Sequence, residues 1–140
     1  MKRRLASTAM LLAASSMQAQ VAPSAREAAA YTGAHAAAWR GDVAAIERGP
    51  KDQAALEARD GNGRTPLHVA TFAKRGEAVR ALIKAGANHA ALDNDRYDAV
   101  TIAAVADDEA TLRVLLAEGA SARLTTSRYD GTALIAAAHL

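Results

Sequence analysis

Apolar and polar positions in the middle of the chain follow the spacing of short amphipathic helices. Leu67 and Ala70 begin one apolar face, and a second helix, expected from about Glu77, places Leu82 and Ile83 on one side. Neither segment carries enough apolar surface to fold alone. The pattern therefore predicts a pair of helices that must pack against further pairs.

Turn and cap residues set the limits of this helix pair. Residues 60–63 (Asp-Gly-Asn-Gly) form a turn sequence, because glycine adopts positive φ and Asp and Asn bond to their own backbone. Thr65 stands where a helix N-cap belongs, and Pro66 takes the first helical position, where its missing N–H costs nothing. Gly86 is expected to end the second helix in a left-handed conformation.

The same unit recurs at a spacing of 33 residues, without a gap between its two clearest copies. The spacing predicts units at about residues 27–59, 60–92 and 93–126 and a partial unit at 127–140. The matching positions are Asp60 and Asp93, Val69 and Ile102, Ala70 and Ala103, Arg80 and Arg113, Leu82 and Leu115, and Gly86-Ala87 and Gly119-Ala120.

The stretch Thr65-Pro66-Leu67-His68 resembles the TPLH signature of ankyrin repeats. Ala70, Leu82-Ile83 and Gly86-Ala87 follow at the spacing of that family. The resemblance covers about residues 27–140. It implies an all-α fold, a solenoid of helix-turn-helix units joined by β-turn or hairpin loops. It also implies a structural role for His68, whose ring would bond to the Thr65 hydroxyl and nearby backbone, and His35 is expected to repeat that role.

Three departures from the family pattern have structural consequences. Lys74-Arg75 replaces the usual Gly-His between the helices, so that connection is expected to differ locally. Asp98 replaces the threonine and should still cap a helix. Gly49-Pro50 falls inside the second helix of the first unit, which is expected to stop near Arg48 because proline breaks helices. The chain ends at Leu140, after the first helix of a fourth unit, which suggests a fragment of a longer array.

The N-terminus resembles a secretory signal peptide. Lys2, Arg3 and Arg4 precede an uncharged, largely apolar stretch over residues 5–16, which is too short for a permanent membrane anchor. We expect cleavage after Ala19, a linker at residues 20–26 and a periplasmic or secreted protein; the alternative is an uncleaved disordered tail.

Composition narrows the possible functions. Residues 1–19 contain three basic and no acidic residues, so the formal charge of +2 becomes −1 when they are removed, which gives no support to nucleic-acid or anionic-membrane binding. The chain has no cysteine, which excludes disulfides, thiol nucleophiles and zinc-thiolate sites. The histidines lack the i, i+3 or i+4 spacing of a metal site, and no calcium loop, nucleophile elbow or phosphate loop is present. We therefore expect no cofactor, no metal, no small-molecule substrate and no catalytic residue.

The resemblance implies that a protein partner binds along the turn tips and the exposed side of the first helices. The leading hypothesis is an exported, non-catalytic interaction module. The alternatives are an inhibitor or effector whose activity lies beyond Leu140, and a structural spacer. The positions expected on the binding surface are Asn62, Arg64, Phe72, Asn94, Asp95, Tyr97, Val105, Arg128, Tyr129 and His139.

Overall fold

A computed structural model describes residues 20–124 and 126 of the chain. These residues form helices and no β-strand, as the sequence predicts. In chain order the helices are α1 (Ala25–Ala30), α2 (Gly33–Arg40), α3 (Val43–Arg48), α4 (Gln53–Leu56), α5 (Pro66–Phe72), α6 (Gly76–Ala85), α7 (Ala99–Val105) and α8 (Glu109–Ala117).

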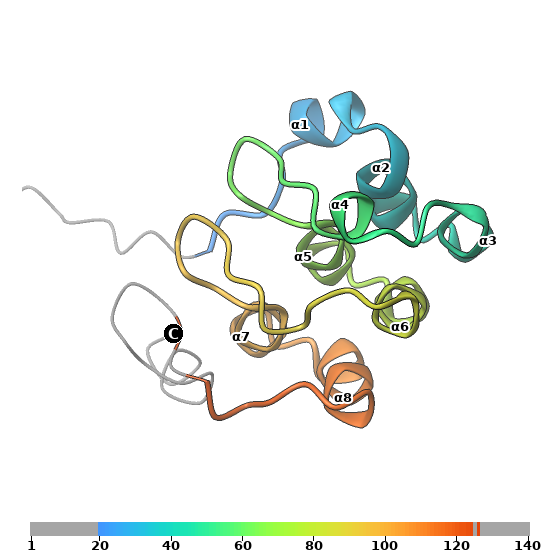
Figure 1. Cartoon of the computed structure of the whole chain (residues 1–140). Coiled ribbons are helices and arrows are strands. Elements are labelled where there is room, and N and C mark those ends of the chain that lie inside the picture. The colour runs from blue at the N-terminus through green and yellow to red at the C-terminus, as the bar shows by residue number, and fades with distance from the viewer. Residues whose placement is uncertain (1–19, 125, 127–140) are drawn as a thin grey trace, which may run out of the picture.

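The helices stand in two columns (Figure 1). The first helices α2, α5 and α7 pack side by side in one column, and the second helices α3, α6 and α8 form the other. Each first helix also contacts the second helix that follows it. The loops between units project away from the second column and form the tips (Figure 1). This arrangement confirms a solenoid of helix pairs.

The first helices begin where the sequence predicts. Thr65 Oγ1 accepts a hydrogen bond from the backbone amide of His68 at 3.4 Å, and Pro66 is the first residue of α5. In the next unit Asp98 Oδ1 accepts the amide of Thr101 at 2.8 Å, so the aspartate caps α7 in place of threonine. Two different side chains thus start equivalent helices in successive units.

The second helix of the first unit stops at Arg48, as predicted from the proline that follows. The ammonium group of Lys51 donates to the carbonyl oxygens of Ile46 at 2.8 Å and Glu47 at 2.7 Å. The Glu47 carbonyl thus gains a donor at the end of the shortened helix, and the Ile46 carbonyl, which also accepts the amide of Gly49 at 3.3 Å, gains a second donor. In the later units, Gly86 ends α6 with a φ of 109°, which confirms the predicted left-handed residue.

Two short helices were not predicted from the sequence. The helix α1 begins inside the predicted linker at 20–26, because Ser24 and Glu27 form a reciprocal capping box. The helix α4 begins where Asp52 Oδ1 accepts the amide of Ala55 at 2.8 Å. Its last residue, Leu56, is buried. The broken second helix of the first unit is therefore followed by one further turn that supplies an apolar side chain to the core.

Small side chains fill the interior between units. Ala37, Ala70 and Ala103 occupy the same position in successive first helices, and all three are buried. In the second column Leu82 and Leu115 are likewise equivalent, and both belong to one continuous apolar cluster. The close approach of the first helices follows from the alanine methyl groups, which keep neighbouring backbones near one another.

The connection between the two helices of each unit requires a left-handed residue. Gly41, Lys74 and Asp107 occupy this position at successive 33-residue steps, with φ of 70°, 56° and 51°. Asp tolerates this conformation better than most residues, whereas lysine has no local hydrogen bond to offset it. The replacement of glycine by lysine in the second unit therefore places strain at Lys74, whose side chain is exposed.

Replacing Lys74 with glycine should stabilise the protein by about 0.5–1 kcal/mol, because the gain from relieving the left-handed strain exceeds the added entropy of the unfolded chain. The measurement is urea unfolding followed by circular dichroism. Lys74→Ala is the matched control, since alanine loses the lysine side chain and keeps the strain. Equal stabilisation by both substitutions would show that side-chain loss, and not backbone conformation, is responsible.

Candidate functional site

An aspartate closes each of the two described tips. Asp60 Oδ1 accepts the backbone amides of Asn62 at 2.8 Å and Arg64 at 2.9 Å. Asp93 Oδ1 accepts the backbone amides of Asp95 and Tyr97, both at 2.9 Å. In both tips the carboxylate thus adds two hydrogen bonds to a backbone turn that is already closed by the amide three residues further along. The two tips consequently have the same shape and can stack.

The tips touch through backbone. The amide of Asn94 donates to the carbonyl of Asn62 at 3.1 Å. Arg59 donates to the carbonyl of Gly63 at 2.8 Å and also to that of Leu92 in the following unit. Gly63 has a φ of 70°, and a Cβ placed there would collide with Oδ1 of Asn94 and lie 3.0 Å from its backbone nitrogen. Only glycine allows this contact between tips.

The ring of His68 joins α5 to the next tip. Its Nδ1 accepts the amide of Thr65 at 3.0 Å and lies 2.8 Å from the Thr65 hydroxyl. Its Nε2 lies 3.0 Å from the carbonyl oxygens of both Ala91 and Tyr97. Because carbonyl oxygens only accept hydrogen bonds, Nε2 carries the proton. The structural role that the family resemblance implies for His68 is confirmed.

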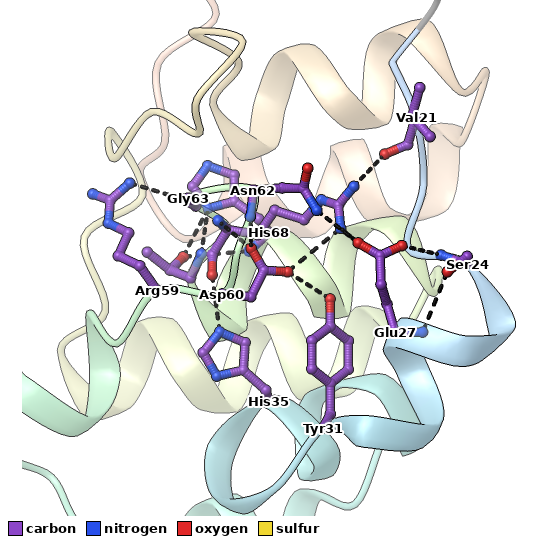
Figure 2. Close-up of polar contacts among 12 residues, drawn as sticks. Val21, Ser24, Glu27, Tyr31, His35, Arg59, Asp60, Asn62, Gly63 and His68 are labelled. Carbon is purple, nitrogen blue, oxygen red and sulfur yellow. Dashed lines mark hydrogen bonds and ion pairs between the residues drawn. The ribbon is translucent and has the colours of Figure 1, made fainter.

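His35 repeats one half of this arrangement. Its Nε2 donates to the carbonyl of Arg64 at 2.8 Å, the counterpart of the bond from His68 to Tyr97 (Figure 2). The other half is missing, because the side chain of Thr32 makes no cap hydrogen bond at the start of α2. His35 therefore holds the tip that follows it without a closed cap at its own helix.

Arg64 was expected on the exposed surface, and this expectation is wrong, because only 3% of the residue is exposed. Its guanidinium donates to Val21 O at 2.7 Å, to Glu27 Oε1 at 3.3 Å and to Asp60 Oδ2 at 3.4 Å. It also lies 5.5 Å from the ring centre of Phe72, in cation–π range. Val21 and Glu27, which contact this side chain, belong to residues 20–30, here called the N-terminal arm; Figure 2 shows both residues.

The groups around Arg64 hold fixed charges. Burial and the hydrogen bond to Asp60 raise the pKa of Tyr31 to about 12, so its hydroxyl keeps the proton that it donates to Asp60 Oδ2 at 2.7 Å. Burial alone would raise the pKa of Asp60, but hydrogen bonds from Tyr31 and from the amides of Arg64 and Asn62 outweigh it and lower the pKa. Hydrogen bonds from the amide and hydroxyl of Ser24 lower the pKa of Glu27. Two carboxylates therefore face one guanidinium.

The other expected binding positions differ in exposure. Asn62 and Asn94 are exposed at the tips, although the Asn62 side chain donates to Glu27 Oε1 at 2.6 Å. Phe72, Asp95 and Val105 are half-buried. Tyr97 is buried, with 8% of the residue exposed, which corrects its expected surface position. Arg128, Tyr129 and His139 lie outside the described residues.

Trp39 belongs to the same surface and was missed in the sequence. It lies one 33-residue period before Phe72, which lies one period before Val105, and all three are half-buried at the ends of the first helices α2, α5 and α7. The three side chains form what we call the apolar ladder: Trp39, Phe72 and Val105. The 33-residue spacing, counted backwards from Phe72, was the signal that could have identified the tryptophan.

Acidic and histidine side chains in the described part of the chain do not gather into a metal site. Within residues 20–124 and 126 there is no group of three that could hold an ion, and no helix there is long and apolar enough to cross a bilayer. In the acidic segment at 107–109, Asp108 caps α8 by accepting the amide of Thr111 at 3.3 Å. The segment thus serves to start a helix.

Comparison with known families agrees with the geometry. A family model described as ankyrin repeats (3 copies) matches residues 34–127. The chain therefore belongs to the ankyrin-repeat family, and its repeats indicate a protein-interaction module. The comparison with curated proteins found no match.

Gly63→Ala should destabilise the protein by roughly 2–4 kcal/mol, because the new methyl group must either push Asn94 away or move the tip, in a left-handed conformation that alanine disfavours. Chemical unfolding measures the change. Gly61→Ala in the same tip is the matched control, since no atom lies within 4 Å of the place that its Cβ would take, and it should change stability by less than about 0.5 kcal/mol. Similar losses for both variants would contradict tip stacking through Gly63.

Acidification should destabilise the protein through His68. Burial lowers the pKa of His68 to about 4, against the hydrogen bonds to Tyr97 and Ala91, which raise it. The unfolded chain, with a pKa near 6.5, therefore binds the proton first, and stability is lost as the pH falls from about 6.5 toward 4. Between about pH 7.5 and pH 5 the loss should be about 2 kcal/mol.

The control for this pH dependence is His68→Gln, measured by urea unfolding at the same two pH values. The variant should be less stable at the higher pH and should lack most of the loss on acidification, because glutamine does not titrate. A variant with the same pH dependence as the parent would assign the effect to other groups.

Proposed function

We propose that this protein is an exported ankyrin-repeat module that binds a protein partner along its tips and first helices and carries no catalytic activity of its own. The observation that carries the proposal is the apolar ladder. Trp39, Phe72 and Val105 repeat at one position of three consecutive first helices, beside tips that expose Asn62 and Asn94.

The chemistry of this surface suits recognition of a protein. Half-buried apolar side chains lose little freedom when a partner covers the rest of their surface, because packing against the stack already restricts their rotamers. Aromatic side chains such as Trp39 and Phe72 contribute most when they are fully desolvated at the centre of an interface. Asn62 and Asn94 offer amide donors and acceptors at the rim. The surface therefore combines an apolar centre with polar edges.

Export is supported by the sequence of residues 1–19, with their basic start and uncharged apolar stretch. The lack of cysteine suits an oxidising compartment, because no thiol is present to be oxidised. We propose that the partner is met in the periplasm or outside the cell.

The proposal is tested by affinity capture with the full-length protein as bait. Extracts of the periplasm, the cytoplasm and the culture medium are compared, and captured proteins are quantified by mass spectrometry. The triple variant Asn62→Ala/Phe72→Ala/Val105→Ala should reduce the amount of partner at least tenfold, because loss of a few central contacts removes most of the binding energy.

The matched control is Lys84→Ala/Arg113→Ala/Leu116→Ala, which changes three side chains on the second helices α6 and α8. It should capture as much partner as the parent, and circular dichroism checks that both triple variants are folded. Undiminished capture by the first variant would overturn the proposed binding surface. Capture from the cytoplasmic extract alone would overturn the proposed compartment.

A further inference from the structure

The N-terminal arm is held to the stack mainly by polar contacts. The helix α1 buries none of its residues. An open hollow of about 440 Å³ separates it from α2, lined mostly by alanine side chains together with Tyr31 and Trp39. Pro23 is the buried residue of the arm. A segment with so few apolar contacts opens at low cost in free energy compared with the core.

The arm's polar contacts converge on one tip. Glu27 Oε1 accepts hydrogen bonds from Asn62 Nδ2 at 2.6 Å and from the Arg64 guanidinium at 3.3 Å. The carbonyl of Val21 accepts a second guanidinium N–H at 2.7 Å. The Glu27 carboxylate in α1 and the Val21 carbonyl in the segment before it thus satisfy three donors of the tip (Figure 2).

These donors belong to the proposed binding surface. Asn62 and Arg64 lie at the tip, and the guanidinium stands over Phe72 of the apolar ladder. While the arm is in place, it covers Arg64 and occupies the side-chain amide of Asn62. A partner that uses this part of the surface must therefore displace the arm.

We propose that the N-terminal arm acts as an internal ligand of the recognition surface, and that the partner replaces it with a peptide segment that places a carboxylate side chain at this tip. The proposal rests on the protein-binding function proposed above and names the chemistry of the partner at this tip. The required groups are a carboxylate in the place of Glu27 and a backbone carbonyl in the place of Val21.

Charge and hydrogen bonding require such a replacement. Departure of the arm leaves guanidinium N–H groups and the Asn62 amide without protein acceptors on that side, and of the ion pairs of Arg64 with Glu27 and Asp60 only the one with Asp60 remains. Arginine has five donors in a fixed planar arrangement, which carboxylate oxygens match well. A segment without a carboxylate at the place of Glu27 would leave these donors without equivalent partners.

Covalent connection makes the arm a strong competitor. Only Tyr31 and Thr32 separate α1 from α2, so the arm is present at an effective concentration in the millimolar range. A free peptide should therefore bind the parent protein weakly. Removing one contact of the arm should raise the apparent affinity for an added peptide that carries the glutamate.

The test uses a dye-labelled peptide with the sequence of residues 20–30, QVAPSAREAAA, and measures its binding to the full-length protein by fluorescence anisotropy. Glu27→Gln protein should bind this peptide at least tenfold more tightly than the parent does. Glu47→Gln, an equal change of charge at an exposed residue of α3, is the matched control and should bind like the parent. Circular dichroism establishes that all variants are folded.

Two further binding measurements test the chemistry. A peptide with glutamine in the place of its glutamate should bind Glu27→Gln protein at least tenfold more weakly than the peptide with glutamate. Adding Asn62→Ala to the Glu27→Gln protein should also weaken binding of the peptide with glutamate. Equal affinities of the two peptides, equal affinities of parent and Glu27→Gln protein, or no binding at any concentration used would each overturn the proposal.

Hydrogen exchange tests displacement without any ligand. The amides of residues 28–31 should exchange at least tenfold faster than those of α5 and α6 in the parent, and Glu27→Gln should accelerate the arm alone. Arm amides that are as protected as the core would overturn the proposal. If the arm exchanges as expected while the Asn62/Phe72/Val105 variant still captures its partner, the binding surface proposed above is wrong and the arm contact stands. If that variant loses its partner while the arm is as protected as the core, the binding surface stands and the role of the arm is rejected.

Discussion

The stack depends on a hydrogen bond that crosses from one unit to the next. The ring Nε2 of His68 donates to the carbonyl of Tyr97, and that of His35 donates to the carbonyl of Arg64, with the same separation along the chain. Alanine methyl groups bring the helices close, but small apolar contacts have no direction. A buried, directed bond is costly to break without a replacement. It therefore fixes how each tip stands relative to the first helix of the preceding unit, which packing alone would leave less defined.

The main helix pairs could be predicted because their signals are local and recur with the period. Thr65 and Asp98 mark the starts of equivalent helices, and the glycine after each second helix marks its end. The short helices α1 and α4 could not be found by apolar periodicity, since α1 buries no residue and α4 has a single turn. Their caps are nevertheless visible in the sequence: Ser24 with Glu27 three residues later is a capping-box pair.

The recognition surface was only partly predictable, because the period gives a residue's place in the unit but not what covers it. Phe72 and Val105 were located correctly on the first helices, and Trp39 follows from the same spacing. The burial of Arg64 depends on Val21 and Glu27, which lie about one unit earlier in the chain and outside the repeat pattern. No local signal links these residues. A contact between a repeat and a segment that is not part of the repeat is visible only in three dimensions.

The backbone and side chain of Arg64 serve different parts of the molecule. Its carbonyl accepts a hydrogen bond from Nε2 of His35, and its amide donates to Asp60, so the main chain of the tip is fixed by the stack. Its guanidinium is shared between Asp60, which belongs to the tip, and the arm. Loss of the arm therefore leaves the donors in nearly the same place. Because little reorganisation is needed before a new acceptor binds, replacement of one carboxylate by another costs less than ordering a flexible loop would. The bonds that hold the units together thus also prepare the tip for an exchange of ligands.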